Sequence, residues 1–321
     1  MNKQQVSWFK QRNLQMIWET LTIGWVAELF NFSSLFKSKY GKLYIYIYHK
    51  LRFIFTKKPV IPLLEYVVTT KCTMNCRECN TRIPEFNKNG THSEVTTYEK
   101  FKYDIDKLLK STDFIYVLGF VGGEPMIAND LYKMIQYAIN LKKIKRVFLA
   151  TNCTILPCNN LIHAMKSNKF SAQISDYRHI NSKIKYNQFK SCLIKNNINF
   201  NNYQEKRNSA TWFSMPEMYI DYNEKRAVEN YKTCFGRYCN MICDGVITQC
   251  TLSVYMYRNL QHTSNVMDEI VNIREIDSYC DLTNKIINFY SRPYSEFCHY
   301  CHWDNVKHDL PCGEQIESES L

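Results

Sequence analysis

Three cysteines in one short segment constrain this chain more than any other feature. Cys72, Cys76 and Cys79 form a C-x3-C-x2-C pattern that directly follows the β-branched run 64–69. Structural zinc sites and simple electron-transfer iron–sulfur clusters take four protein ligands. Three soft thiolates from one loop therefore indicate an iron–sulfur cluster with one iron left open for chemistry. The alternative is zinc, which needs a fourth ligand such as His92, the nearest histidine.

The size and composition of the chain are compatible with a folded metalloprotein. Its 321 residues are 45% hydrophobic, which is enough for one large domain or two modest ones. The first residues lack the apolar stretch and cleavage site of a secretory signal, so we expect a cytoplasmic protein. Fourteen cysteines in that compartment favour metal binding over disulfides.

The net charge of +11 does not by itself indicate a nucleic-acid partner. The most basic short segment, 142–146, is typical of a helix C-terminus that leads into a strand, where cations suit the helix dipole. We therefore expect no nucleic acid partner. The acidic segment 314–321 is expected to be disordered.

The N-terminal part of the chain suggests surface contact more than membrane crossing. The most apolar segment, 17–36, is interrupted by Glu19, Glu28 and Asn31, so no transmembrane helix is expected. Segment 37–58 mixes seven Lys or Arg with Tyr, Phe and Ile. It could lie on a membrane surface or dock a partner, but the favoured interpretation is an amphipathic extension that covers the main domain.

The rest of the chain alternates strands and helices, which predicts an α/β protein with a parallel sheet. We divide the chain into a helical extension, a core and a C-terminal region at 1–58, 59–229 and 230–321. The predicted strands are 64–69, 114–120, 146–150, 171–175 and 198–200, and the predicted helices are 97–109, 131–141 and 183–195. Ligands of parallel sheets gather at the carboxyl ends of the strands. Polar or glycine residues follow four of these ends, namely Cys72, Gly122, Thr151 and Asp176.

A glycine-rich turn follows the second predicted strand. The segment 119–125 reads Gly-Phe-Val-Gly-Gly-Glu-Pro and holds three of the chain's nine glycines. Glycine permits a close approach of the backbone to a ligand. An ordinary strand-to-helix turn is the alternative interpretation, because Glu and Pro suit the first turn of a helix.

Taken together, the cysteine loop and the Gly122-Gly123-Glu124-Pro125 turn resemble the radical S-adenosylmethionine (radical SAM) family over about residues 62–205. The resemblance implies a partial (β/α)6 TIM-like barrel. It also implies that the three cysteines hold a 4Fe–4S cluster whose fourth iron is chelated by S-adenosylmethionine (SAM). The resemblance places the following residues at the SAM site: Gly122, Gly123, Glu124, Thr151, Asn152 and, on a weaker match, Ser175 and Asp176.

Two positions depart from the family's pattern. Cys153 replaces the glycine of the Thr-Asn-Gly that follows the third strand. Glu78 stands where the family usually has an aromatic residue near the adenine.

The late cysteines resemble the auxiliary-cluster domains called SPASM and twitch. The matching positions are Cys234, Gly245, Cys250, Cys298 and Cys301, and the series stops there because residue 307 is lysine. The resemblance implies a short, twitch-like domain in which these four cysteines hold one further 4Fe–4S cluster. Rivals for the ligand places are Cys239, Cys243 and Cys312. Since helical periodicity fades after about residue 230, we expect a small domain organised by metal, and a zinc ribbon is the alternative.

The resemblance also implies an activity. A radical SAM enzyme cleaves SAM reductively to a 5′-deoxyadenosyl radical, which abstracts a hydrogen atom from a substrate. Twitch enzymes include dehydrogenases of sugar-like alcohols, so oxidation or rearrangement of a small carbohydrate is expected, with flavodoxin or ferredoxin as reductant. Peptide maturation is the second hypothesis, and a non-catalytic zinc-binding interaction protein is a third, from a different class. The sequence names no catalytic side chain.

Overall fold

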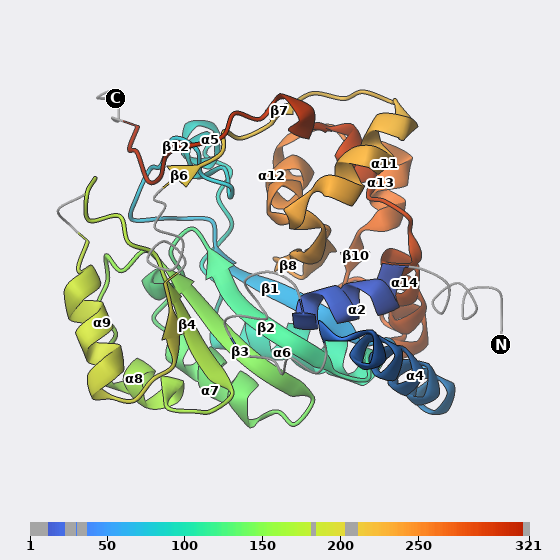
Figure 1. Cartoon of the computed structure of the whole chain (residues 1–321), viewed down its shortest axis with the longest axis horizontal. Coiled ribbons are helices and arrows are strands. Elements are labelled where there is room, and N and C mark those ends of the chain that lie inside the picture. Colours follow the sequence, from blue (N-terminus) through green and yellow to red (C-terminus); the bar gives the residue numbers. More distant parts are fainter. Residues whose placement is uncertain (1–11, 23–29, 31–36, 181–183, 203–210, 317–321) are drawn as a thin grey trace.

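An eight-stranded sheet forms the centre of the protein in the computed structural model, which describes residues 12–22, 30, 37–180, 184–202 and 211–316 (Figure 1). Its strand order is β10-β9-β8-β1-β2-β3-β4-β5. The strands are β1 (Ile61–Thr69), β2 (Ile115–Gly122), β3 (Ile144–Thr151), β4 (Phe170–Ile174), β5 (Phe200–Asn201), β8 (Asn240–Cys243), β9 (Val246–Thr248) and β10 (Val271–Asn272). Two small antiparallel pairs join β6 (Thr211–Trp212) to β12 (Leu310–Pro311) and β7 (Glu217–Met218) to β11 (Cys301–His302).

The central strands run parallel, as the alternating sequence pattern predicts. Strands β1 to β5 are parallel neighbours in chain order. A sixth parallel strand, β8, pairs with the other edge of β1, while β9 and β10 continue antiparallel. The predicted α/β class with a parallel sheet is therefore confirmed, and the sheet is open, in keeping with a partial barrel.

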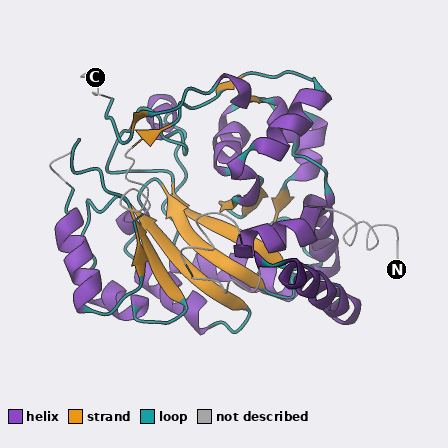
Figure 2. Cartoon of the chain, viewed as in Figure 1, coloured by secondary structure: helices purple, strands orange, loops and turns teal. Residues whose placement is uncertain are grey.

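The helices α6 (Tyr98–Ser111), α7 (Leu131–Asn140) and α8 (Asn159–Met165) lie along one face of this sheet (Figures 1 and 2). Helix α9 (Tyr186–Lys195) follows β4, and the short helix α5 (Ile83–Asn89) follows the cysteine loop and lies near β6 and β12. In α6, Thr97 caps the start by accepting a hydrogen bond from the Lys100 amide at 3.3 Å. Phe101, Ile105 and Leu108 follow at helical spacing and are fully buried. Their burial in the main core explains why this segment folds as a helix against the sheet.

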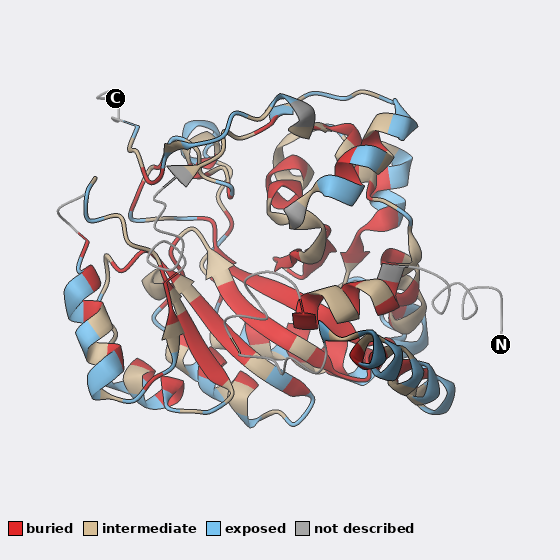
Figure 3. Cartoon of the chain, in the orientation of Figure 1, coloured by how far each residue is buried: buried red, intermediate tan, exposed pale blue. Residues whose placement is uncertain are grey.

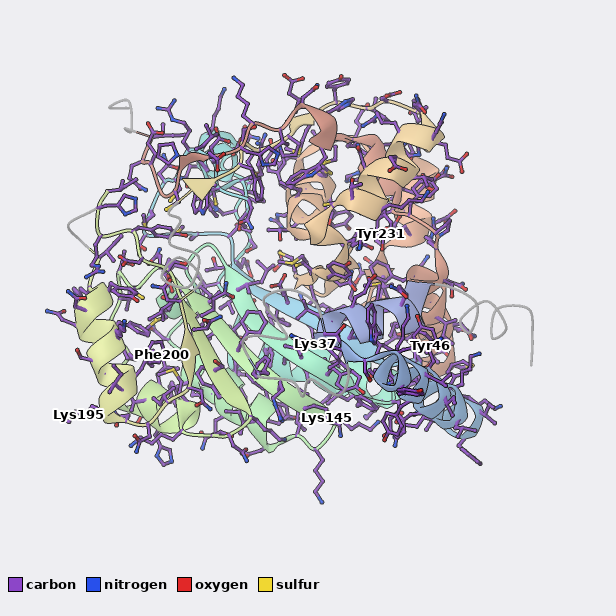
Figure 4. The ribbon with its side chains drawn as sticks, viewed as in Figure 1. Lys37, Tyr46, Lys145, Lys195, Phe200 and Tyr231 are labelled. Atoms are coloured by element: carbon purple, nitrogen blue, oxygen red, sulfur yellow. The ribbon has the colours of Figure 1, made fainter. Side chains whose placement is uncertain are left out.

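The described part of the N-terminal segment forms two helices, α2 (Arg12–Thr22) and α4 (Lys39–Thr56). The side chain of Tyr46 on α4, labelled in Figure 4, donates a hydrogen bond to Gln15 of α2 at 2.7 Å. Among the described residues, no helix is long and apolar enough to cross a bilayer. The rest of the N-terminal segment, at 1–11, 23–29 and 31–36, lies outside the described residues.

The C-terminal region contains more helix than the fading periodicity suggests. Its four α-helices are α11 (Glu224–Thr233), α12 (Thr251–Asn259), α13 (Ser264–Glu269) and α14 (Tyr279–Ser291). Most have ten residues or fewer, so each shows only two or three turns of periodicity. Caps define their ends instead: Asn223, Thr263 and Ser278 each accept a hydrogen bond from a backbone amide three residues later.

Candidate active site

The carboxyl ends of the parallel strands open into a cavity of about 400 Å³. Residues from eight separate stretches of the chain line it, and eight of these residues are positions that the sequence predicts for the cluster and SAM. These eight are Cys72, Cys76, Cys79, Gly122, Gly123, Thr151, Asn152 and Ser175. The other two predicted positions, Glu124 and Asp176, lie beside the cavity without lining it.

The glycine-rich turn is held against the cysteine loop by backbone hydrogen bonds. The Gly123 amide donates to the Thr69 carbonyl at 2.8 Å, and the Glu124 amide donates to the Lys71 carbonyl at 2.9 Å. A Cβ atom added at Gly123 lies only 2.1 Å from the Lys71 oxygen, and one at Gly122 lies 2.1 Å from the Thr69 oxygen. Gly122 also has a φ of +142°. Any side chain here forces the turn away from the loop, which explains both glycines.

Glu124 connects the glycine turn to the end of β3. The Thr151 hydroxyl lies 3.0 and 3.1 Å from its two carboxylate oxygens, and the Asn152 amide donates to it at 2.8 Å. The Met126 amide donates a further bond at 3.1 Å. The carboxylate is fully buried, and burial raises its pKa to about 7. Glu124 therefore positions the walls of the cavity and does not face the ligand space.

Asn152 connects the end of β3 to the cysteine loop. Its side-chain nitrogen lies 3.1 Å from the Thr73 hydroxyl and 3.6 Å from Sγ of Cys72. The next residue, Cys153, has a φ of +60°, which explains why the family pattern has glycine there. Its side chain is fully buried, so the thiol lies away from solvent.

Asp176 contributes less to the cavity than its place at a strand end suggests. Its carboxylate pairs with Arg178 at 2.6 Å, and this contact lowers the pKa of Asp176. Ser175 and Tyr177, on either side of it, line the cavity instead.

The three thiols of the cysteine loop all line the main cavity. Burial raises the pKa of Cys72 and of Cys76 to about 12, and it raises the pKa of Cys79 as well. Thiolates at these positions therefore need a positively charged partner. Within the described part of the chain, no three His, Cys, Asp or Glu side chains converge as they do around a single ion. Thiols spread around a cavity suit the larger body of an iron–sulfur cluster, so these residues fit the cofactor that the sequence predicts.

The C-terminal segment 314–316 pairs with the cysteine loop. The prediction that segment 314–321 is disordered is therefore wrong for residues 314–316. The Arg77 amide donates to the Glu314 carbonyl at 2.7 Å, and the Ile316 amide donates to the Asn75 carbonyl at 2.8 Å. Gln315 donates from its side-chain nitrogen to Sγ of Cys76 at 3.2 Å. The acidic composition did not reveal this, because the pairing uses main-chain groups and an amide. Residues 317–321 lie outside the described part.

A second, smaller cavity of about 60 Å³ lies in the C-terminal region. It is lined by all four cysteines that the sequence predicts for the auxiliary cluster, namely Cys234, Cys250, Cys298 and Cys301. Burial raises the pKa of each of these thiols. The Gly236 amide donates to Sγ of Cys234 at 3.2 Å.

The three rival cysteines lie elsewhere. Cys239 lines the main cavity, where its thiol is hydrogen-bonded to Glu65. Cys243 is buried among the residues that pack under the β8–β9 hairpin. Cys312 lies 3.9 Å from His179, measured from Sγ to Nε2.

The two cavities share a wall. Asn80, Phe213, Met215 and Thr251 line both of them. Glu78, which departs from the family's aromatic residue, fixes this wall by accepting a hydrogen bond from the Met215 amide at 2.7 Å. The sequence alone did not indicate this role, because the partner is a backbone group 137 residues away.

No family model matches the chain. Curated relatives include the GTP 3′,8-cyclases of several Clostridium botulinum strains, such as Hall and Langeland, which are radical SAM enzymes. They are 32% identical over 98 residues, or 30% of this chain and 29% of the relative. The match spans less than a third of the relatives' length, so it shows a local similarity to radical SAM enzymes and does not extend to their reaction.

Solved radical SAM structures are also similar, at 14% identity. A native anSMEcpe with bound AdoMet has a TM-score of 0.47, covering 72% of this chain and 83% of that one. BtrN in complex with AdoMet and 2-DOIA has a TM-score of 0.44, and the match covers 79% of this chain and 96% of that one. Streptococcus suis SuiB bound to S-adenosylmethionine has a TM-score of 0.41, and the match covers 76% of this chain and 71% of that one.

Proposed function

We propose that this protein is a radical SAM enzyme that binds a 4Fe–4S cluster at Cys72, Cys76 and Cys79 and SAM beside Gly122 and Gly123. The main support is that all five residues line one cavity of about 400 Å³. When bound, the cluster and SAM supply a reductively generated radical that abstracts a hydrogen atom. A cavity of this size lies within the range of small-molecule sites.

The chain's own residues orient the reactants and restrict water. Gly122 and Gly123 bring the backbone of β2 close to the loop, and Asn152 fixes the loop from β3. Apolar side chains from three strands, Val121, Ala150 and Met241, form part of the lining. An apolar wall of this kind limits competing hydrogen donors around a radical.

We further propose that Cys234, Cys250, Cys298 and Cys301 hold an auxiliary 4Fe–4S cluster. The support is their common cavity and the wall that it shares with the main one. Electron transfer between the two sites, or anchoring of a substrate near the second, follows from this proximity. The zinc-protein hypothesis explains the second cavity but not the three-cysteine loop paired with the glycine turn.

We propose an uncharged or cationic substrate, with a small carbohydrate first and a peptide second. Among the described residues that line the cavity, the carboxylates are Glu65 and Glu78, and none is a lysine or arginine. Glu65 lies deep in the sheet, at the register of Gly119 in β2 and Met241 in β8. A carboxylate suits a hydroxyl or amine donor, whereas a triphosphate such as GTP requires cationic groups.

Anaerobic incubation with SAM and dithionite tests the function. We expect 5′-deoxyadenosine to form, and the Cys76→Ala variant to produce none. A sample with a full complement of iron and sulfide that leaves SAM intact contradicts the mechanism. Zinc without sulfide in the purified protein supports the interaction-protein hypothesis instead.

A further inference from the structure

The helix α4 carries an exposed apolar stripe on the surface of the protein. Seven of the sixteen large hydrophobic side chains that are exposed among the described residues lie on this one helix. They are Tyr40, Leu43, Tyr44, Ile47, Leu51, Ile54 and Phe55. Tyr40 and Phe55 are the most exposed of all, at 82% each. Figure 3 shows α4 at the edge of the molecule with much of its outer surface exposed.

The opposite side of α4 already packs against the protein. Its buried residues, Gly41, Ile45, His49 and Phe53, recur at intervals of four. At 3.6 residues per turn, the exposed stripe is centred almost directly opposite this buried row. Burial in the body of the protein therefore does not explain the stripe.

Polar contacts hold α4 in this orientation. Arg52 binds the carboxylate of Asp113 with two nitrogen atoms, at 2.6 and 2.8 Å. His49 Nε2 lies 2.8 Å from the hydroxyl of Tyr116. Asp113 lies two residues before β2 and Tyr116 lies in it, so both partners belong to the central sheet region. These contacts fix α4 with its apolar stripe facing away from the protein.

The charges around the stripe indicate what it contacts. Segment 37–58 contains seven Lys or Arg and no Asp or Glu. Lys39 and Lys50 are exposed, and their helical positions border one edge of the stripe, while the exposed Lys57 directly follows the end of α4. Aromatic and aliphatic side chains beside a row of lysines are typical of a helix that lies in the plane of an anionic membrane interface.

We propose that α4 docks this protein onto the surface of an anionic lipid bilayer, with the stripe inserted at the headgroup boundary and the lysines paired with lipid charges. This surface is separate from both cavities, since none of the stripe residues lines either one. The proposal therefore does not depend on the proposed function.

Vesicle flotation of the full-length protein tests the proposal. Wild-type protein is expected to float with vesicles that combine phosphatidylcholine and phosphatidylserine, and to float much less with phosphatidylcholine alone. Added salt should weaken the binding, because the charges are solvent-exposed. Binding to neither vesicle, or equal binding to both, overturns the proposal.

Three variants locate the contact. Ile47→Asp, within the stripe, should lower the bound fraction at least tenfold. Ile194→Asp is the matched control, because Ile194 is 58% exposed on the unrelated helix α9. Lys50→Glu keeps the stripe intact and should weaken binding by at least about fivefold on anionic vesicles only.

Two further measurements keep the result interpretable. Thermal denaturation must show that each variant is folded. If Ile47→Asp is unfolded, the comparison of Lys50→Glu with wild type decides the outcome. Light scattering without lipid reports the oligomeric state. If wild type is a dimer that Ile47→Asp converts to a monomer, the stripe contacts a second copy, and the membrane proposal is overturned.

Discussion

The side-chain amide of Gln315 donates a hydrogen bond to Sγ of Cys76 at 3.2 Å, although 239 residues separate the two. The same glutamine accepts a hydrogen bond from the Asn75 amide at 2.7 Å, so its orientation is fixed. Hydrogen bonds to cluster sulfurs stabilise the more negative, reduced state. The C-terminal segment is thus placed to adjust the redox properties of the proposed cluster.

Replacing Gln315 by Leu should lower the midpoint potential of the cluster at Cys72, Cys76 and Cys79. An EPR-monitored redox titration measures this most cleanly in a Cys298→Ala background, which removes the auxiliary signal. The neighbouring variant Glu314→Gln loses the 3.4 Å ion pair with Arg77 but keeps the main-chain pairing. We expect it to leave the potential unchanged. Equal potentials in Gln315→Leu and wild type argue against a tuning role.

Gly123→Ala should disrupt the contact between the glycine turn and the cysteine loop. The added methyl group lies 2.1 Å from the Lys71 oxygen and 3.0 Å from Cβ of Cys72, so the backbone must move. We expect SAM affinity, measured by anaerobic calorimetry, to fall at least tenfold. Gly90→Ala is the control, because nothing lies within 4 Å of its added Cβ. Its φ of +64° costs about 1 kcal/mol of stability and should not affect SAM binding.

Iron and sulfide analysis distinguishes the proposed auxiliary ligands from their rivals. Two 4Fe–4S clusters correspond to about eight irons and eight sulfides per chain. Cys298→Ala should reduce this to about four of each, with the first cluster retained. Cys239→Ala should keep about eight irons, since that thiol lines the other cavity. Loss of four irons in Cys239→Ala would identify it as a ligand.

The stability of the protein should depend on pH through Glu65. Burial raises the pKa of this carboxyl to about 7 from its ordinary value of 4.5. The folded state therefore favours the protonated form, and this contribution to stability is lost as the pH rises through about 7. Glu65→Gln should raise the free energy of unfolding at pH 8 by up to about 3 kcal/mol and change it little at pH 5. Denaturant titrations at both values measure this, and a gain of the same size at pH 5 rules out titration as the cause.

Much of the architecture could be predicted from the sequence because the signals were local. The β-branched run before Cys72 and the apolar spacing from Phe101 to Leu108 gave the positions of β1 and α6 within a few residues. The glycine turn was found because glycines concentrate where the backbone approaches another segment closely.

Other features depend on contacts between distant segments and left no local pattern. The roles of Glu78 and Gln315 rest on partners 137 and 239 residues away. Glu124 stands in a recognisable motif, yet the motif does not show that its carboxylate turns toward Thr151 and away from the cavity. The buried pair of Glu65 and Cys239 joins β1 to the residue directly before β8, and these two strands meet only in the folded sheet.

The pairing of β8 with β1 has a consequence for how the chain can be divided. Leu64, Glu65 and Tyr66 of β1 are paired with β8 on one side and with β2 on the other. A protein truncated at residue 229 would leave this strand as a bare sheet edge, open to pairing with another chain. Such a fragment is expected to aggregate even though the cysteine loop, the glycine turn and the first five parallel strands are all intact. The cysteine loop and the late cysteines are thus connected through one continuous sheet, and a cut between them opens that sheet.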